Sequence, residues 1–352
     1  MIHNNDYMTH PGESDSQIPE KKPIRFSETA AKINNVLERM MPVLTPAGIA
    51  MGIIFTSFYL NLRPYIPWLF GAITLAGALK LRARDLLQAV KNPFPIIIFF
   101  FNAHIVMPLL TMFLAGLVFG NDPDTISGYV LIYSVPTAVS GFIWVSIYRG
   151  DPALSLALIL IDTFFAPLIV PGTVRLLLGT KVSLDITGMA VSLIFMVVAP
   201  TIIGITVNEA SRGKIPKLIC PYFTPFSKIL LFLVISANCA PIASQINLQN
   251  PRIWIIGIVC ICFTFIGFTC GKIAGMIGRH FGLLGKSGRE KQISLLFASG
   301  LRNISAAMTL GIEYFPAPAA LPTVLGIVFQ QSIAAIVGKI YIGKESADRE
   351  KE

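Results

Sequence analysis

Residues 297–308 read FASGLRNISAAM, and this stretch decides how the rest of the chain is interpreted. A glycine, an arginine and an asparagine interrupt an apolar run that extends from Ile293 to Ile312. A charged side chain at the centre of a bilayer costs roughly 2.5 to 3.5 kcal/mol on insertion scales, so Arg302 must face protein, water or a ligand. The pattern therefore predicts a broken membrane helix that lines a site.

The composition of the whole chain is that of a membrane protein. Of its 352 residues, 54% are hydrophobic and only 13% are charged, and the mean hydropathy is +0.68. Soluble domains carry about 25% charged residues. The apolar residues come in blocks of about 20, which is enough to cross a hydrocarbon core of about 30 Å. We therefore predict a polytopic, all-helical integral membrane protein.

Ten membrane spans are expected between two polar tails. The first 39 residues lack the apolar core of a signal peptide and are typical of a disordered cytoplasmic tail, with a short amphipathic helix as an alternative at its end. The expected spans are 41–60, 67–81, 94–119, 126–148, 153–178, 186–207, 226–246, 253–277, 292–314 and 319–341. Together they make one membrane domain, residues 40–342, and a cytoplasmic tail, residues 343–352, follows it.

The placement of basic residues predicts the orientation. With both termini inside, twenty-one of the 28 Lys and Arg residues lie in inside segments and four in outside segments. Such an excess is the orientation signal of a multi-span protein. It also explains the net charge of +9 without nucleic acid, which we exclude as a partner. We expect a multi-pass protein of the plasma (inner) membrane, surrounded by the lipid bilayer.

The ten spans divide into two corresponding sets of five, residues 40–180 and 181–342. The fourth span is interrupted at 136–141 (PTAVSG), and the ninth, its counterpart, at 298–305. An odd number of spans per half forces the repeats into opposite orientations, so these two broken spans are expected to cross. Paired, interrupted spans at matching positions indicate a secondary-transporter site near the membrane midplane.

Two formal charges lie near the middle of spans, Arg302 in the ninth and Asp162 in the fifth. Each would be costly alone, so we expect them to pair or to share a substrate. Ser155 precedes Asp162 by seven residues and lies on the same helical face. The adjacent glutamines Gln330 and Gln331 of the tenth span are expected near the crossing. The alternative is a structural ion pair that fixes the crossing and takes no part in transport.

Further polar residues complete the candidate site. Asn303 and Ser299 either contact a ligand or satisfy backbone groups that the break frees. Asn102, His104 and Asn238 are weaker candidates, for which an interhelical hydrogen bond is the alternative. His104 could also carry a proton. The candidate substrate and coupling residues are Arg302, Asp162, Asn303, Ser299, Gly300, Ser140, Gly141, Thr137, Ser155, Asn238 and Gln330.

The sequence contains no P-loop, zinc signature or catalytic triad. Its five cysteines lie in or beside apolar runs and show no metal-ligand spacing with histidine, so buried packing is their expected role. We therefore expect no enzyme activity, no cofactor and no metal.

Several landmarks are shared with a known family. They are LKLRARDLLQAVKNP (79–93), Met107-Pro108-Leu109, the Arg149-Gly150 turn followed by Ala153-Leu154-Ser155, Pro167, and Gly300 with Asn303. From about residue 41 to 341 the chain thereby resembles the bile acid:sodium symporter family. The resemblance implies ten spans, inverted five-span repeats, and discontinuous fourth and ninth spans that cross at the site.

The resemblance also shows where sodium ligands are missing. Sodium-coupled members carry a Ser-Asn pair where this chain has Gly141-Phe142, and an acid and a glutamine where it has Ala298 and Arg302. Because a guanidinium repels sodium, we expect a sodium-independent carrier of a small organic anion that works by alternating access, coupled to protons or uncoupled. The alternatives are efflux of a metabolite or arsenite, and a membrane receptor or scaffold that has lost transport.

Overall fold

The computed structural model describes residues 25–83, 91–120, 122–179, 185–247, 249–285 and 287–343. These residues form helices and one isolated bridge, with no strand among them, which confirms the predicted all-helical class. The first helix begins at Arg25 and runs without a break from the end of the predicted tail into the first expected span. Good helix formers there continue into the apolar run, and extending an existing helix costs little. Residues 1–24 and 344–352 of the predicted tails lie outside the described residues.

The helices cover the expected spans, although α12 begins at Lys214, twelve residues before the seventh span expected at 226–246. Those of the first half are α1 (Arg25–Ile54), α2 (Thr56–Leu60), η1 (Arg63–Tyr65), α3 (Ile66–Ala78), α5 (Phe94–Phe101), η2 (Asn102–Val106), α6 (Met107–Phe119), α7 (Pro123–Ser134), α8 (Gly141–Ile147) and α9 (Pro152–Leu178). Those of the second half are α10 (Ile186–Leu193), η3 (Ile194–Val198), α11 (Ala199–Ala210), α12 (Lys214–Cys239), η4 (Ala240–Gln245), α13 (Pro251–His280), α14 (Gly288–Gly300), α15 (Ile304–Tyr314), α16 (Ala317–Gly338) and η5 (Lys339–Gly343).

Six helical runs in the described part of the chain are long and apolar enough to cross a membrane. They are 94–119, 152–178, 186–210, 214–245, 251–280 and 317–342. The other four expected spans are short or interrupted. The first divides between α1 and α2, the second is the 13-residue α3, and the fourth and ninth are broken. The count of ten spans and the inverted relation between the two halves stay predictions.

Acidic and amide side chains begin several helices. In each of five helices the side chain of the N-cap residue accepts a hydrogen bond from a backbone N–H of the first turn. The pairs are Asp122 with α7, Asp151 with α9, Asp185 with α10, Asn250 with α13 and Asn303 with α15. Such a cap contributes about 1 kcal/mol. These caps therefore help to fix the residue at which the chain returns to helix after each turn or break.

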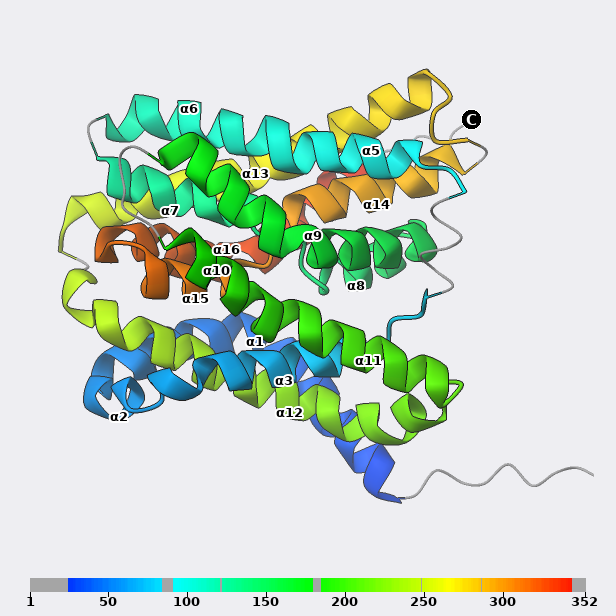
Figure 1. The fold of residues 1–352 in the computed structure, drawn as a ribbon, viewed down its shortest axis with the longest axis horizontal. Helices are drawn as coiled ribbons and strands as arrows, with labels where there is room; N and C mark the ends of the chain where they lie inside the picture. The colour runs from blue at the N-terminus through cyan, green and yellow to red at the C-terminus, as the bar shows by residue number, and fades with distance from the viewer. Residues whose placement is uncertain are drawn as a thin grey trace, which may run out of the picture.

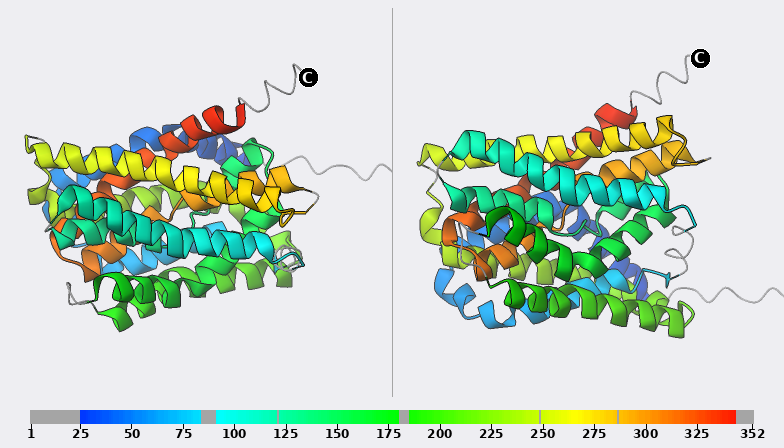
Figure 2. Two further views of the ribbon diagram at one scale, coloured as in Figure 1. Left: turned by 90° about the horizontal axis from the view of Figure 1, so that it is seen from above. Right: turned by 45° about the horizontal axis from the view of Figure 1, so that its top comes forward.

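The helices are arranged in two groups, which Figures 1 and 2 show from different sides. We call α1, α2, α3, α11 and α12 the panel, which lies at the bottom of Figure 1, and α5 to α9 with α13 to α16 the core. Glycines allow close approach within each group. A Cβ at Gly128 of α7 would lie 2.1 Å from the carbonyl oxygen of Ala319 on α16, and one at Gly52 would lie 2.2 Å from that of Ser236 on α12.

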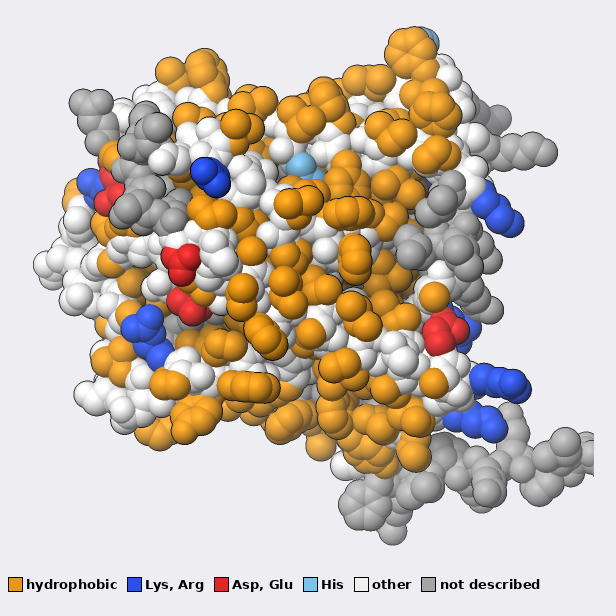
Figure 3. Space-filling view, viewed as in Figure 1, with side chains coloured by type: hydrophobic (Ala, Val, Ile, Leu, Met, Phe, Trp, Pro, Cys, Tyr) orange, Lys and Arg blue, Asp and Glu red, His pale blue; other side chains and the backbone are white. Residues whose placement is uncertain are grey.

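The outer surface is apolar across the middle of the face in Figure 3, and charged side chains gather toward its two ends. Large side chains such as Trp68, Leu168 and Leu176 are 77%, 73% and 84% exposed. In water such exposure would be costly, whereas hydrocarbon tails solvate these groups well. The surface is that of a protein embedded in a bilayer.

Candidate functional site

The two broken helices meet where each is interrupted. α7 ends at Ser134 and α8 begins at Gly141, while α14 ends at Gly300 and α15 begins at Ile304. The chain between them is extended, and Thr137 faces Arg302 in an antiparallel bridge. The backbone N–H of Ala138 donates to the carbonyl oxygen of Leu301, and that of Asn303 to the carbonyl oxygen of Pro136, both at 2.8 Å.

This mutual pairing explains how the breaks are tolerated. Inside a bilayer each unsatisfied backbone group costs several kcal/mol, so non-helical backbone is found only where protein covers it. The hydroxyl of Thr137 lies within hydrogen-bond distance of two carbonyl oxygens across the crossing, those of Ala298 (2.8 Å) and Leu301 (2.9 Å), and shares its one proton between them. The predicted crossing of broken spans is therefore present, and it is held by backbone bonds between the two segments.

Arg302 lies at the centre of this crossing and is only 1% exposed. Its Nη2 donates to the carbonyl oxygen of Val135, the C-cap residue of α7, where the helix dipole favours a cation. Its Nη1 lies 3.7 Å from Oδ2 of Asp162. Within the described residues, neither Nε nor Nη1 has a hydrogen-bond partner, although both are buried. The guanidinium is thus hydrogen-bonded through Nη2, while its Nε and Nη1 remain available to donate.

Asp162 is completely buried on α9 and has three neighbours. Its Oδ2 accepts a hydrogen bond of 2.7 Å from the backbone N–H of Thr137, besides facing Arg302. Its Oδ1 lies 2.7 Å from Nε2 of His104, which belongs to the π-helix η2. The structure therefore brings Asp162 and Arg302 together as the sequence predicts, but the shortest side-chain contact of the carboxylate is with His104.

The remaining residues of the ninth-span break have structural partners. Ser299 accepts a hydrogen bond of 3.0 Å from Nδ2 of Asn102, another residue of η2. Asn303 caps α15, because its Oδ1 accepts from the N–H of Ala306 at 3.2 Å. Gly300 packs against Phe268, and a Cβ added there would lie 2.2 Å from the nearest ring carbon. For Ser299 and Asn303, the bonds favour the interhelical and backbone roles over direct ligand contact in this conformation.

The fourth-span break connects to α16 through the two glutamines. Gln330 donates to the carbonyl oxygen of Arg302 at 2.9 Å, and Gln331 donates to the hydroxyl of Ser140 at 3.0 Å. Gln331 in turn accepts from Nε1 of Trp144 at 2.9 Å. Gly141 begins α8, with ordinary contact distances to Leu301. Both glutamines are thus near the crossing, as expected.

Two predicted residues stand outside this network. Ser155 is buried on α9, two turns before Asp162, which is about 10 Å along a helix. Asn238 of α12 donates to the hydroxyl of Thr309 on α15 at 2.9 Å. Neither side chain bonds to Arg302 or Asp162 in the described part of the chain. Asn238 instead links the panel to the core.

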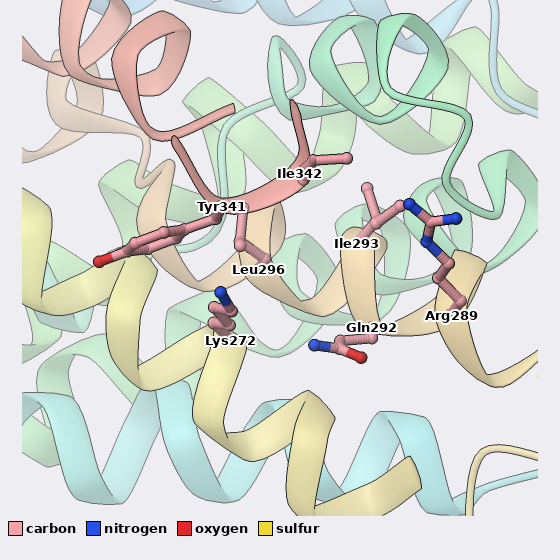
Figure 4. A pocket seen from close by; sticks show the side chains of 7 residues that line it. All are labelled: Lys272, Arg289, Gln292, Ile293, Leu296, Tyr341 and Ile342. Carbon is pink, nitrogen blue, oxygen red and sulfur yellow. The ribbon is translucent and has the colours of Figure 1, made fainter. Parts of the chain in front are cut away.

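A shallow hollow of about 10 Å³, which is space for about one water molecule, lies elsewhere, between α13, α14 and η5 (Figure 4). It is lined by Lys272, Arg289, Gln292, Ile293, Leu296, Tyr341 and Ile342. Nζ of Lys272 lies 4.4 Å from the ring centre of Tyr341, a cation–π contact. No lining residue belongs to the crossing, so the hollow is not the site built around Arg302.

The described residues contain no group of three or more His, Cys, Asp or Glu that could hold a metal ion. The described site chemistry is a guanidinium, a carboxylate, an imidazole and backbone groups, all buried between broken helices. Broken helices that meet inside a bundle of membrane helices are typical of secondary transporters. The fold and site therefore define the chain as a multi-pass membrane protein of the transporter class.

Comparison with known proteins agrees with this class. The profile of the "Sodium Bile acid symporter family" matches residues 67–248. A Bacillus subtilis (strain 168) relative named "Uncharacterized protein YbaS" is 37% identical over 298 residues, which cover 85% of this chain and 95% of that protein. The chain belongs to the sodium bile acid symporter family. It is a transporter-family protein that acts on a small-molecule substrate and is embedded in a membrane.

More distant relatives carry names that mention sodium. One from Bacillus subtilis, "Uncharacterized sodium-dependent transporter YocS", is 23% identical over 78% of this chain and 82% of its own length. Another from Arabidopsis thaliana, "Probable sodium/metabolite cotransporter BASS6, chloroplastic", is 25% identical over 88% of this chain and 74% of its own length. These names describe those proteins. Whether this chain also uses sodium depends on the residues at its crossing.

Proposed function

We propose that the chain is a secondary-active transporter of a small organic anion that works by alternating access and does not use sodium. The observation that carries this proposal is the buried guanidinium of Arg302, whose Nε and Nη1 have no hydrogen-bond partner among the described residues. Arginine is the side chain best suited to hold a carboxylate or a similar anion, because its planar fork can donate two parallel hydrogen bonds. A substrate anion would supply the acceptors that the buried donors lack.

The surroundings of Arg302 support binding of an anion. The N-terminus of α15, capped by the next residue Asn303, contributes partial positive charge from its backbone. Because Arg302 is 1% exposed, substrate reaches it only after the panel moves relative to the core. The division of the helices into these two groups supports that rocking motion (Figure 1).

The charge at the crossing argues against sodium. A hard cation needs several oxygen ligands, and the oxygens near the crossing already have partners. The carbonyl oxygen of Val135 accepts from Arg302. The carboxylate of Asp162 accepts from the N–H of Thr137 and contacts Nε2 of His104. A fixed guanidinium in the same low-dielectric space would also repel a sodium ion. The neutral Ala298 offers no acid in compensation.

Other parts of the proposal rest on matched features of the two halves. A side chain from α9, Asp162, accepts from the N–H of Thr137, and a side chain from α16, Gln330, donates to the carbonyl of Arg302. Thr137 and Arg302 are themselves bridge partners. This correspondence supports two inverted five-span repeats, hence ten spans, and the basic-residue distribution supports a plasma-membrane protein with both termini in the cytoplasm.

Counterflow in liposomes tests the proposal directly. Purified protein is reconstituted into liposomes that contain an unlabelled anion. The liposomes are then tested for exchange with radiolabelled acetate, benzoate, cholate or benzenesulfonate outside, in sodium buffer or in choline buffer. We expect exchange of at least one probe, unchanged when choline replaces sodium. Arg302→Gln should abolish it, and Lys80→Gln, far from the crossing in sequence, is the matched control. Exchange that requires sodium would overturn sodium independence, and normal exchange by Arg302→Gln would overturn the role of the arginine.

A membrane receptor or scaffold is the second candidate, because the described crossing is closed around Arg302. It predicts that a probe anion raises the unfolding temperature of the protein without any exchange. Efflux of a metabolite remains within the transport proposal, and inside-out vesicles would show its direction. For arsenite, a soft thiol ligand is expected, and no cysteine bonds to the residues of the described crossing.

A further inference from the structure

The pair of His104 and Asp162 has a capacity that anion binding by Arg302 does not use. A buried carboxylate that already accepts from the N–H of Thr137 offers only acceptors, so Nε2 of His104 is the donor in the 2.7 Å contact. In the neutral ring, Nδ1 then carries a lone pair. Nδ1 is buried and has no hydrogen-bond partner within the described part of the chain. This atom can therefore take up one proton.

We propose that His104 and Asp162 form the coupling site of the transporter, with a proton on Nδ1 of His104 as the coupling ion. The inference rests on the proposed anion transport. Transfer of the proton from a hydronium ion breaks one O–H bond, forms the Nδ1–H bond, and leaves a water molecule and an imidazolium. The imidazolium remains bonded to the carboxylate through Nε2.

The charge balance at the crossing links the proton to the anion. With neutral His104, the carboxylate of Asp162 and the guanidinium of Arg302 compensate each other at 3.7 Å. With the imidazolium present, one carboxylate faces two buried cations, and the surplus positive charge is unfavourable in a low dielectric. A monovalent anion at Arg302 removes that surplus. Proton and anion therefore promote each other's binding. By thermodynamic linkage, each raises the affinity of the site for the other by the same factor.

The position of His104 suits this role. It lies in η2, a π-helical turn inside an otherwise α-helical span, and such turns are frequent at functional sites. Phe100 covers the ring at a centroid distance of 5.2 Å, and Phe99 meets it edge-on at 6.2 Å. The side chain is 7% exposed, so the aromatic rings shield the proton from bulk water.

The other acidic and histidine side chains of the helices packed near η2 lie toward helix ends. α5 and α6 carry none. Tyr129 of α7 donates to the carbonyl oxygen of Ile256. The titratable or charged residues of the packed helices are Asp124, Tyr129 and Tyr133 on α7, Asp162 and Arg175 on α9, Arg252, Cys260, Cys262, Cys270, Lys272, Arg279 and His280 on α13, and Arg289, Glu290 and Lys291 on α14. In the described residues, Asp162 is the acid paired with His104.

The test separates exchange from accumulation. Vesicles containing the full-length protein are placed in a more acidic buffer, which creates an inward proton gradient. The probe is benzenesulfonate, which stays ionised and does not cross the bilayer as a neutral acid. Uptake of cholate and benzoate is measured against protein-free vesicles. Coupling of one proton per anion sustains an accumulation of about tenfold for a gradient of about one pH unit. His104→Gln keeps a donor for Asp162 but cannot be protonated. We expect the pH-driven accumulation, expressed relative to the counterflow measured in the same vesicles, to be lost in this variant.

His280→Gln, on the exposed end of α13, is the matched control and should accumulate as the wild type does. An internal pH dye should show that acid enters together with the anion in the wild type and not in His104→Gln. Accumulation by the wild type that ignores the pH gradient, or pH-driven accumulation that survives in His104→Gln, overturns the inference while leaving anion transport intact. Absence of counterflow in the wild type with every probe defeats the transport proposal itself, and the proton site falls with it.

Discussion

Thr137 and Arg302 face each other across the point where the two broken helices meet, and each satisfies backbone groups that the other's segment leaves open. Thr137 does more than its backbone requires. Its N–H donates a hydrogen bond to Oδ2 of Asp162, and its hydroxyl lies within hydrogen-bond distance of the carbonyl oxygens of Ala298 and Leu301. One residue therefore joins the fourth-span break to the ninth span and to the carboxylate of the fifth.

Replacing Thr137 by valine should destabilise the protein measurably. Thr137→Val keeps the shape of the side chain and removes the hydroxyl, so the buried carbonyl oxygens of Ala298 and Leu301 lose the one O–H donor that they share. The expected loss is about 1–3 kcal/mol of unfolding free energy, which a thermal or chemical unfolding curve in detergent would show. Thr137→Ser keeps the hydroxyl and serves as the control. Equal stability of the valine and serine variants would contradict the bonding role of this hydroxyl.

A double substitution distinguishes a transport site from a purely structural ion pair. Asp162→Asn or Arg302→Gln alone leaves one buried charge without its partner, and such a loss costs about 3–5 kcal/mol. The double variant Asp162→Asn/Arg302→Gln removes both charges and should recover much of that stability. If Arg302 binds the anion, counterflow stays absent in the double variant. Recovery of counterflow together with stability would show that the pair only fixes the crossing.

The breaks and the buried charge could be predicted because their signals are local. Gly300 and Arg302 interrupt an apolar run, Pro136 interrupts another, and the cost of a charge in hydrocarbon applies wherever the helix packs. The positions of the helices followed for the same reason, since hydropathy and proline or aspartate caps act within a few residues.

The contact of His104 with Asp162 could not be predicted, because it depends on which spans are neighbours. Periodicity places His104 in the third span and Asp162 in the fifth, but gives no rule that η2 packs beside the middle of α9. The π-helical turn, which re-aims Asn102 and His104, also has no clear sequence signal. The rarity of polar residues in midspan was the available hint, since such residues seek each other in a bilayer.

Gly300 should not tolerate even one added methyl group. A Cβ at this position would lie 2.2 to 2.5 Å from three ring carbons of Phe268, which is itself fully buried and cannot move aside easily. Overpacking of this kind costs about 1–3 kcal/mol, so Gly300→Ala should unfold at a lower temperature and exchange anions more slowly. Gly141→Ala is the matched substitution at the other break, where the nearest atom would be 3.8 Å away. Comparable losses in both variants would contradict the packing argument.

Asn238 and Thr309 offer a direct test of motion between the panel and the core. Their buried hydrogen bond of 2.9 Å joins α12 to α15, and alternating access requires this contact to open in part of the cycle. In a background where the five native cysteines are replaced, Asn238→Cys/Thr309→Cys should bind a mercuric ion between the two thiols. We expect the ion to stop counterflow and a dithiol to restore it, while either single-cysteine variant remains active. Full activity of the bridged protein, with the bridge verified by mass, would show that the panel and the core need not separate at this contact.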